Sequence, residues 1–232
     1  MERMRARPRS GVLASDEDDA PPHRARQPER TREKILQAAM AEFSTRGLGG
    51  ARVDSIAQRA GVNKRMLYHY FGNKDDLFLA VMEHTYESIR QLESDLRLED
   101  GEPLDAMRRL IKFTFGYFVD NPHFISLLNS ENLHRARHIK RSRRVKDINN
   151  PVIRSLDRLL KRGHRAGIFR SGVDPLQLYI SIAGVCYFYF SNIYTLSVIF
   201  DRDLTRKDAL ARRAAHVEDV IIGFLCSRPP PH

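Results

Sequence analysis

Two short helical patterns joined through one glycine constrain the fold of this 232-residue chain more than any other feature. Apolar residues recur at helical spacing over Val53–Ala60, and a second pattern of this kind covers Lys64–Phe71. Gly61 supplies the left-handed backbone conformation that a sharp turn needs, and Asn63 is a favourable N-cap for the second helix. The spacing therefore predicts a helix-turn-helix, whose second helix has the diameter to enter a B-DNA major groove.

Helical periodicity continues through the rest of the chain, and no stretch shows the alternation that predicts a strand. We expect Thr31 to cap the first helix and Gly47 to end it, and we expect an interruption or a kink near Pro151. The predicted helices span residues 31–47, 53–60, 64–71, 75–96, 103–120, 123–133, 137–166, 174–198 and 205–226. The predicted fold class is all-α, with an amino-terminal three-helix unit followed by a larger helical bundle.

Composition along the chain suggests four parts. Residues 1–30 are rich in Arg, Pro and Asp without apolar periodicity, which predicts a flexible arm. Residues 31–76 hold the three-helix unit, residues 77–226 form the bundle, and residues 227–232 form a disordered tail.

Residues 175–200 carry no charged side chain, a length that could span a bilayer. Polar residues and tyrosines are distributed along the segment, which favours a buried bundle helix over a membrane helix. Apolar residues from Leu176 to Tyr194 and from Leu210 to Phe224 follow heptad-like spacing. We expect one face of this helix pair to pack inward and another to form a four-helix interface with a second subunit.

The net charge of +10 is by itself a non-specific signal, and it points to an anionic partner only if the basic residues are concentrated in one segment. Eight basic residues and three acidic residues lie between Arg32 and Lys74, so this segment supplies half of the excess. Arg65, Met66 and His69 lie on or beside the outer face of the second helix, where they can reach base edges. The charge distribution therefore favours nucleic-acid binding by the helix-turn-helix.

The stretches Ile56-Ala57, Ala60-Gly61-Val62, Leu67–Phe71 and Asn73–Leu77 carry a family resemblance. In their order and spacing, residues 32 to about 80 closely resemble the amino-terminal domain of the TetR/AcrR family of transcriptional regulators. The resemblance implies a DNA-binding domain, then a ligand-binding and dimerisation bundle, in a homodimeric repressor that a small-molecule effector releases from a palindromic DNA operator. The family pattern places these residues at the DNA: Asn63, Lys64, Arg65, Met66, Tyr68, His69, Tyr70 and Lys74.

Two departures from the family pattern matter for DNA recognition. Many members have a small Gly-Thr pair where this chain has Arg65-Met66, and many cap the second helix with Thr or Ser where it has Ala51-Arg52. Loss of a cap costs about 1 kcal/mol of helix stability, whereas Arg52 adds a candidate DNA contact. The operator sequence therefore does not follow from relatives.

Within the bundle, aromatic residues and amides are candidates for an effector site. We predict ligand contacts from Phe113, Tyr117, Asn129 and Tyr187. Two features nearby stay open. The basic run from Arg135 to Lys146 contains no acidic residue among its cations, and it is compatible with a solvated helix face or with binding of an anionic effector or extra DNA. Glu131, His134 and His138 have helical spacing compatible with metal ligands, although surface histidines are more common.

Other function classes receive less support. The chain has no phosphate-cradling glycine loop, Gly-x-Ser-x-Gly elbow or His-Glu-x-x-His motif, so we expect no enzyme and no cofactor. Two cysteines in apolar surroundings and the lack of an export signal favour the cytoplasm. The alternatives are a nucleoid-type protein that binds DNA without sequence preference and a membrane-attached sensor with residues 175–200 in lipid.

Overall fold

The computed structural model describes residues 23–226; residues 1–22 of the predicted arm and the predicted tail at 227–232 lie outside the described residues. All regular elements in the described part are helices, which confirms the all-α fold class. The α-helices are α1 (His23–Gly50), α2 (Val53–Ala60), α3 (Lys64–Phe71), α4 (Lys74–Ser94), α5 (Pro103–Asp120), α6 (Pro122–Leu133), α7 (Arg143–Arg165), α8 (Pro175–Ser191), α9 (Ile193–Ile199) and α10 (Lys207–Cys226), with a 3-10 turn η1 (Ile139–Arg141) before α7.

The first helix begins earlier than the sequence predicted. Thr31 was expected to cap it, but Thr31 lies inside α1, where its hydroxyl donates to the Gln27 carbonyl at 2.9 Å. A threonine hydroxyl can bond to the preceding helical turn instead of capping the next one, so the predicted cap is wrong. Gly47 leaves the helical conformation with φ 63° and ψ 175°, which confirms the predicted end of the main helix.

Two predicted helices in the bundle are divided at places that the sequence did not indicate. The predicted helix 137–166 is broken at Ser142, whose side chain caps α7, while Pro151 lies inside α7 without ending it. The predicted helix 174–198 is broken at Asn192, and α8 and α9 are bent there by 64°. At this break the Phe188 carbonyl accepts both the Asn192 backbone N–H, at 3.2 Å, and the Asn192 side-chain amide, at 2.9 Å.

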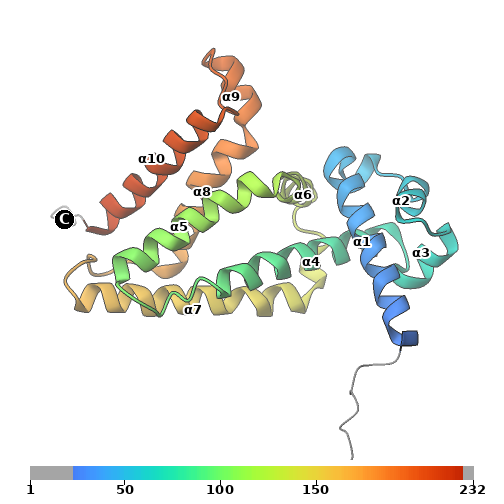
Figure 1. Ribbon diagram of the computed structural model, residues 1–232, viewed down its shortest axis with the longest axis horizontal. Coiled ribbons are helices and arrows are strands. Elements are labelled where there is room, and N and C mark those ends of the chain that lie inside the picture. Colours follow the sequence, from blue (N-terminus) through green and yellow to red (C-terminus); the bar gives the residue numbers. More distant parts are fainter. Residues whose placement is uncertain (1–22, 227–232) are drawn as a thin grey trace, which may run out of the picture.

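The helices form two hydrophobic cores that meet along α4 and α6. The first core joins α1, α2 and α3 to the start of α4, and it takes in Leu127 from α6. The second core fills the bundle of α5, α7, α8 and α10 and begins on α4 at Ile89. Figure 1 shows α4 running from the small amino-terminal unit into the bundle, with α6 close to α1. These two helices therefore connect the two parts physically.

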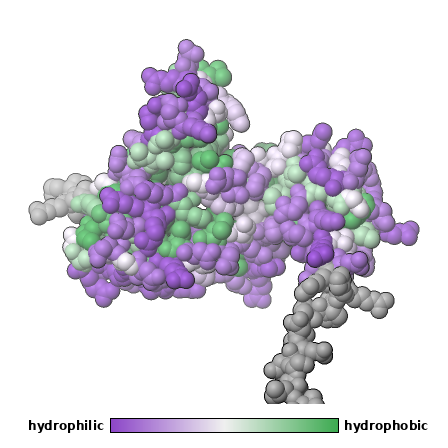
Figure 2. Space-filling model, viewed as in Figure 1, coloured by the Kyte–Doolittle hydropathy of each residue, from purple (hydrophilic) through white to green (hydrophobic). Residues whose placement is uncertain are grey.

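The last helices divide their apolar residues between the core and the surface. Val217 and Ile221 face the second core of their own chain, so the heptad-like stripe on α10 packs inward over this stretch. On α8 a different face stays exposed, including Leu176, Ile180 and Phe188. Figure 2 shows hydrophobic residues gathered on the side of the bundle between its hydrophilic tip and its base. An apolar surface is thus present on α8, but it does not follow the predicted stripe throughout.

None of the helices in residues 23–226 is by itself both long and apolar enough to cross a membrane. Helices α8 and α9 pass that test of length and composition only as a pair bent by 64°.

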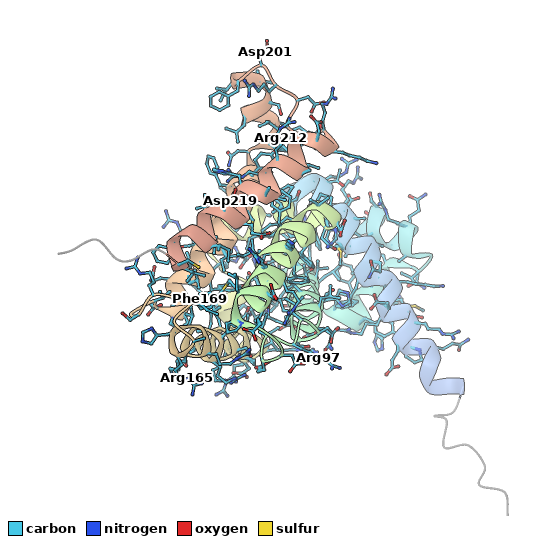
Figure 3. All side chains as sticks on the ribbon, turned by 60° about the vertical axis from the view of Figure 1, so that its left-hand side comes forward. Arg97, Arg165, Phe169, Asp201, Arg212 and Asp219 are labelled. Carbon is cyan, nitrogen blue, oxygen red and sulfur yellow. The ribbon has the colours of Figure 1, made fainter. Side chains whose placement is uncertain are left out.

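One glycine near the end of α7 allows a close contact that any side chain would block. The ring of Phe169, in the connection between α7 and α8 (Figure 3), lies over Gly163, and a Cβ at Gly163 would be 1.9 Å from Phe169 Cδ2. The Phe169 N–H also donates to the Gly163 carbonyl at 3.1 Å, so the ring and the backbone are held together.

We therefore expect Gly163→Ala to destabilise the protein by about 1–3 kcal/mol, because the buried ring has to move. Gly116→Ala is the matched control, since Gly116 is also helical and its added Cβ would meet no atom within 4 Å. Alanine there should be neutral or stabilise by up to about 1 kcal/mol. Urea denaturation of both variants measures the difference, and equal midpoints would argue against the tight contact.

Candidate nucleic-acid interface and ligand cavity

The turn between α2 and α3 has the geometry that the sequence predicted. Gly61 adopts φ 68° and ψ 32°, a left-handed conformation, and the Val62 N–H returns to the Ala57 carbonyl at 3.0 Å. Asn63 then caps α3, because its side-chain oxygen accepts the Met66 N–H at 2.8 Å. These bonds fix the direction in which α3 leaves α2.

Only two residues of α3, Leu67 and Phe71, are buried. They attach the helix to the first core, the half-buried Tyr70 also packs against that core, and the other side chains of α3 are exposed. Met66 and Tyr68 expose 39% and 41% of their surface. Of the predicted DNA contacts, the exposed residues are Arg52, Asn63, Lys64, Arg65, Met66, Tyr68 and His69, while Tyr70 and Lys74 are half-buried.

A buried glutamate of α1 satisfies one backbone N–H at the start of α2. Arg52 is the N-cap residue and makes no side-chain capping bond. Its backbone N–H instead donates to Glu42 Oε1 of α1 at 3.2 Å, and Arg46 and Arg59 pair with the same carboxylate at 3.4 and 4.0 Å. The sequence pattern missed Glu42 because its partners are distant along the chain. This contact leaves the Arg52 side chain exposed to solvent.

Two basic candidates already have partners near α3. Lys64 Nζ lies 2.9 Å from Asp54 Oδ1 of α2, and the hydrogen bond to Asp54 raises the pKa of Lys64 above its usual value. Lys74 Nζ donates to the Gly49 carbonyl at 3.3 Å. Both bonds are exposed or partly exposed, where such contacts contribute little and exchange readily for a phosphate.

The basic run from Arg135 to Lys146 finds its acids on α4. Arg137 pairs with Asp75, Arg141 pairs with Asp76, and Arg144 pairs with Glu87. Asp75 and Asp76 lie in the first turn of α4, directly after α3. The run therefore lies against the helix that follows the helix-turn-helix, and three of its cations are paired within the chain.

Glu131 and His138, two of the three suggested metal ligands, bind each other. Glu131 Oε1 accepts the backbone N–H groups of His138 and Ile139 at 2.8 and 2.9 Å, and Glu131 Oε2 lies 2.6 Å from His138 Nδ1. His134 bonds through Nδ1 with the Ser130 carbonyl. Residues 23–226 contain no group of three His, Cys, Asp or Glu side chains arranged to hold a metal ion. The Glu131–His138 pair instead closes the connection between α6 and α7.

A cavity of about 420 Å³ lies in the bundle, within the size range of small-molecule sites. Helices α4, α5, α6, α7 and α8 all contribute to its walls, which are mostly apolar. Its aromatic wall is formed by Tyr86, Phe118, Phe124, Tyr179 and Tyr187. A second cavity of about 330 Å³ lies between α5, α6 and the α8–α10 region, and Phe118 lines both.

The four predicted ligand contacts are distributed over different places. Tyr187 lines the larger cavity, and its hydroxyl donates to Oδ1 of Asn129, which lines the smaller one. Tyr117 lies in the second core beside Phe124, where burial raises its pKa to about 12. Phe113 packs against the same core, 6.0 Å from Tyr117 between ring centroids. The structure thus brings Asn129 and Tyr187 together and places Phe113 and Tyr117 in the packing behind the cavity.

The larger cavity also contains a pair of charged residues that the sequence did not single out. Arg90 Nη1 lies 2.6 Å from Glu93 Oε2, and Arg90 Nη2 donates to the Tyr179 hydroxyl at 2.8 Å. The Arg90 and Glu93 side chains are only 9% and 6% exposed. Burial raises the pKa of Glu93 to about 7, with Arg90 acting in the opposite direction. The signal in the sequence was Glu93 itself, which continues the apolar stripe of Tyr86 and Ile89 at helical spacing.

Comparisons with known proteins agree with this architecture. The family model described as bacterial regulatory proteins, tetR family, matches residues 35–81, and the model described as tetracyclin repressor-like, C-terminal domain, matches residues 103–221. The HTH-type transcriptional repressor NicS of Pseudomonas putida is 38% identical over 199 residues, which are 86% of this chain and 94% of that protein. An HTH-type transcriptional repressor of Streptomyces coelicolor is 51% identical over 59 residues, 25% of this chain and 31% of that protein.

Solved structures share the fold at low sequence identity. The fatty acid degradation regulator FadR of Bacillus halodurans has a TM-score of 0.61 at 20% identity, over 84% of this chain and 99% of that chain. FadR of Bacillus subtilis, solved in complex with stearoyl-CoA, has a TM-score of 0.59 at 20% identity over the same shares.

Proposed function

This chain belongs to the TetR family of bacterial transcriptional regulators and is a ligand-responsive DNA-binding repressor, and from this premise we propose how it binds DNA and its effector. Two copies bind a near-palindromic operator, each with α3 in a major groove. A small molecule in the bundle then releases the DNA. Since the operator is chromosomal DNA, the repressor works in the cytoplasm.

The exposed outer face of α3 is the observation that supports this DNA interface best. Lys64, Arg65, Met66, Tyr68 and His69 are exposed on one short helix whose other side is anchored in the first core. In the proposed complex Arg65 and His69 reach base edges, while Lys64 and Tyr68 contact the phosphate backbone. Arg52, Asn63, Met66, Tyr70 and Lys74 complete the proposed contact surface.

Helix α4 gives the bundle a direct route to α3. It begins at Lys74, immediately after the turn that ends α3, and its second half carries Arg90 and Glu93 into the larger cavity. A ligand that moves α4 would therefore change the position of α3 relative to the second subunit. By thermodynamic linkage, operator DNA must then weaken ligand binding by the same factor as ligand weakens DNA binding.

We place the homodimer interface on the last two long helices, α8 and α10. Exposed apolar side chains, including Leu176, Ile180 and Phe188 on α8 and Val220 on α10, make a surface that water solvates poorly. Gly184 on α8 and Gly223 on α10 are also exposed, which permits close approach of a partner helix. A two-fold axis here would give a four-helix interface.

Phe188→Glu is expected to shift the protein from dimer to monomer, because the change places a charge at the centre of that interface. Leu133→Glu is the control, since Leu133 is 82% exposed but lies at the end of α6. Light scattering after size-exclusion chromatography measures both. A Phe188→Glu variant that stays dimeric at micromolar concentration contradicts this interface.

Competition binding tests the function itself. Labelled DNA from the region flanking the gene is bound, and unlabelled duplex of the same sequence or of random sequence is added at about 200 mM salt. A sequence-specific repressor keeps its complex until the random duplex is in at least about a thousandfold excess over the specific competitor. Equal displacement by both duplexes would instead identify a nucleoid-type binder.

A further inference from the structure

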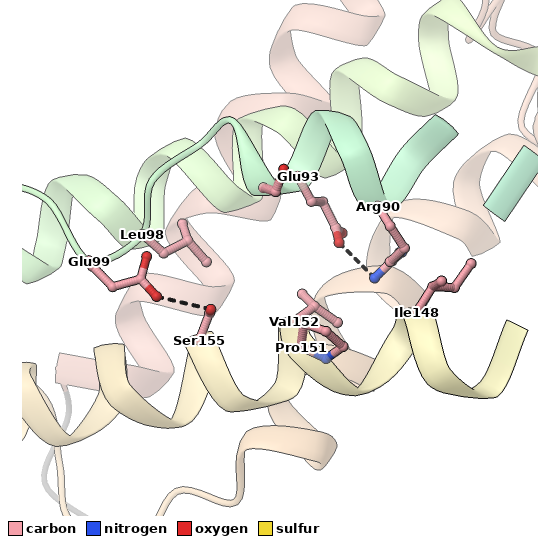
Figure 4. Close-up of a pocket in the computed structure, with 9 residues that line it drawn as sticks. Arg90, Glu93, Leu98, Glu99, Ile148, Pro151, Val152 and Ser155 are labelled. Carbon is pink, nitrogen blue, oxygen red and sulfur yellow. Dashed lines mark hydrogen bonds and ion pairs between the residues drawn. The ribbon is translucent and has the colours of Figure 1, made fainter. Parts of the chain in front are cut away.

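Among residues 23–226, the charged side chains that line the larger cavity form a single pair. Of the side chains that line it, Arg90 and Glu93 are the charged ones, and the others are apolar or neutral polar groups. Both come from the second half of α4, one turn apart, and Figure 4 shows their ion pair facing α7. Recognition of a ligand's charge in this cavity therefore depends on this pair.

Arg90 has hydrogen-bonding capacity that the described chain does not use. Its Nη2 donates to Tyr179, whereas Nε and Nη1 are buried without an aligned hydrogen-bond partner among residues 23–226, although Nη1 is close to Glu93. A guanidinium group has five N–H donors and accepts nothing. A ligand group that offers two adjacent acceptor atoms would satisfy these donors, as a carboxylate does.

The two charges of the pair differ in how easily they can be neutralised. Arginine stays protonated at every pH at which proteins fold, so Arg90 is a permanent cation. Glu93 is buried, and its pKa of about 7 lets it take up a proton near neutrality. The cavity can therefore change from neutral to positive by protonation of Glu93, but Arg90 always opposes a cationic ligand.

The remaining walls indicate the body of the ligand. Tyr86, Phe118, Phe124 and Tyr187 present aromatic rings from four helices around the charged pair. Rings of this kind pack favourably on planar apolar groups. A volume of about 420 Å³ holds one or two rings.

We infer that the effector is a small aromatic carboxylate whose anionic group binds Arg90 in place of Glu93, with uptake of a proton by Glu93. The inference rests on the proposed function, since it names the ligand class of the effector cavity. The proton balance is closed, because the ligand arrives as the anion and Glu93 receives one proton from water. Net charge in the cavity is zero before and after binding.

Glu93 is the group whose protonation changes between pH 6 and pH 9 at this site. On α4 and α5, burial raises the pKa of Tyr86 and Tyr117 to about 12, and on α8 burial also raises the pKa of Tyr179. Those hydroxyls stay protonated. Arg90 and Glu93 also line a small pocket of about 80 Å³ between α4 and α7, and Glu99 lines the same pocket (Figure 4). Glu99 bonds to Arg158 and Ser155 of α7, which lowers its pKa and keeps it ionised. On α7, Asn149 lines the larger cavity and Ser155 lines the small pocket, and neither side chain titrates.

Matched probes test the ligand class. Benzoate and 2-naphthoate, their neutral amides and their cationic amidines share a ring and differ in charge, and titration calorimetry on the DNA-free protein compares them at pH 6.5. We expect at least one carboxylate to bind at least tenfold more tightly than its amide, with weaker binding still for its amidine. Equal binding within a set, preference for an amide or amidine, or binding of none of the six overturns the inference.

The pH dependence tests the proton uptake. Because binding favours protonated Glu93, carboxylate affinity should be level below about pH 6.5 and fall about tenfold per unit above about pH 7.5. Glu93→Gln should bind with less than twofold change from pH 6 to 9, whereas Asp95→Asn, an exposed change at the end of α4, should keep the wild-type profile. A flat wild-type profile, or a sloping one in Glu93→Gln, overturns proton uptake.

A double variant controls for folding. Arg90→Met alone leaves Glu93 buried without its partner, so Arg90→Met combined with Glu93→Gln removes both charges together. We expect the double variant to fold, to bind operator and to lose the preference for carboxylate over amide. Retained preference overturns the role of Arg90. Operator binding is measured separately by competition. If the wild-type protein does not bind DNA sequence-specifically, the proposed function is wrong, whereas a wrong ligand class leaves that function standing.

Discussion

Replacing Arg65 with alanine is expected to weaken binding to the specific operator by about 5- to 150-fold, the range for one base contact of about 1–3 kcal/mol. Arg65 is exposed on α3, and its neighbours Leu67 and Phe71 hold that helix in the first core. The substitution removes a side chain that we propose to contact DNA, without removing one that packs in the core. Binding to random duplex should change much less, so the ratio of specific to random affinity should fall.

Lys74→Ala separates base reading from phosphate binding. Lys74 lies beside α3 with its ammonium on the Gly49 carbonyl. Its loss should weaken binding to every duplex and reduce the slope of log affinity against log salt by about one unit. Arg154→Ala, an exposed change on α7, is the control and should alter neither quantity. If Arg65→Ala and Lys74→Ala reduce affinity equally for all sequences, the division of roles on this surface is wrong.

Glu131→Ala is expected to cost about 3–5 kcal/mol of stability, the range for breaking a buried polar pair. The Glu131 carboxylate accepts two backbone N–H groups, and it also bonds the His138 ring, which is fully buried. Alanine would leave all three groups buried without that partner. Arg135 and Ala136 hold strained positive φ angles of 55° and 57° in the same turn. The alanine variant would also lose the Glu131 bonds that offset this backbone strain.

Chemical denaturation measures the loss, with Glu131→Gln and Asn132→Ala as comparisons. Glu131→Gln would keep one accepting oxygen and should cost less than the alanine substitution. Asn132 is the exposed neighbour, and its removal should change stability by no more than about 1 kcal/mol. A Glu131→Ala variant as stable as Asn132→Ala would show that the bonds of Glu131 are not needed to hold α6 to α7.

Local signals were sufficient to predict the helix-turn-helix. Gly61 has the left-handed conformation that its position between two short patterns predicted, and Asn63 caps α3 as expected. Each of these features depends on residues within one or two turns. The helix α5, from Pro103 to Asp120, likewise has the predicted limits, because a proline starts it and Asn121-Pro122 follows it.

Errors arose where a distant or competing contact decides the structure. The helix was expected to be interrupted or kinked near Pro151, yet α7 is not interrupted there, and the break falls at Ser142, whose hydroxyl caps the next helix. The break between α8 and α9 falls at Asn192, a position that helical periodicity does not indicate. Glu42 of α1 accepts the Arg52 N–H at the start of α2, and spacing along the chain cannot indicate such a contact between two helices.

The ligand cavity was predictable in kind but not in its residues. Aromatic residues in the bundle predicted a ligand site, and the bundle contains a cavity that Tyr187 lines, with Asn129 bonded to the Tyr187 hydroxyl. Phe113 and Tyr117 belong to the same aromatic group, but the rotation of α5 directs them into the core. Arg90 and Glu93 were overlooked because a charged pair at i and i+3 on a helix is ordinarily a surface feature, and only tertiary packing buries it.

Hydroxyl-radical footprinting of the operator tests most directly whether paired α3 helices read DNA. The account predicts two short protected segments on one face of the duplex, related by two-fold symmetry and with centres about 34–36 Å apart or a multiple of that distance. At the protein concentration that half-saturates the wild-type site, protection of both segments should fall together in Arg65→Ala. A continuous footprint without symmetry, or one that Arg65→Ala leaves intact, would contradict the account.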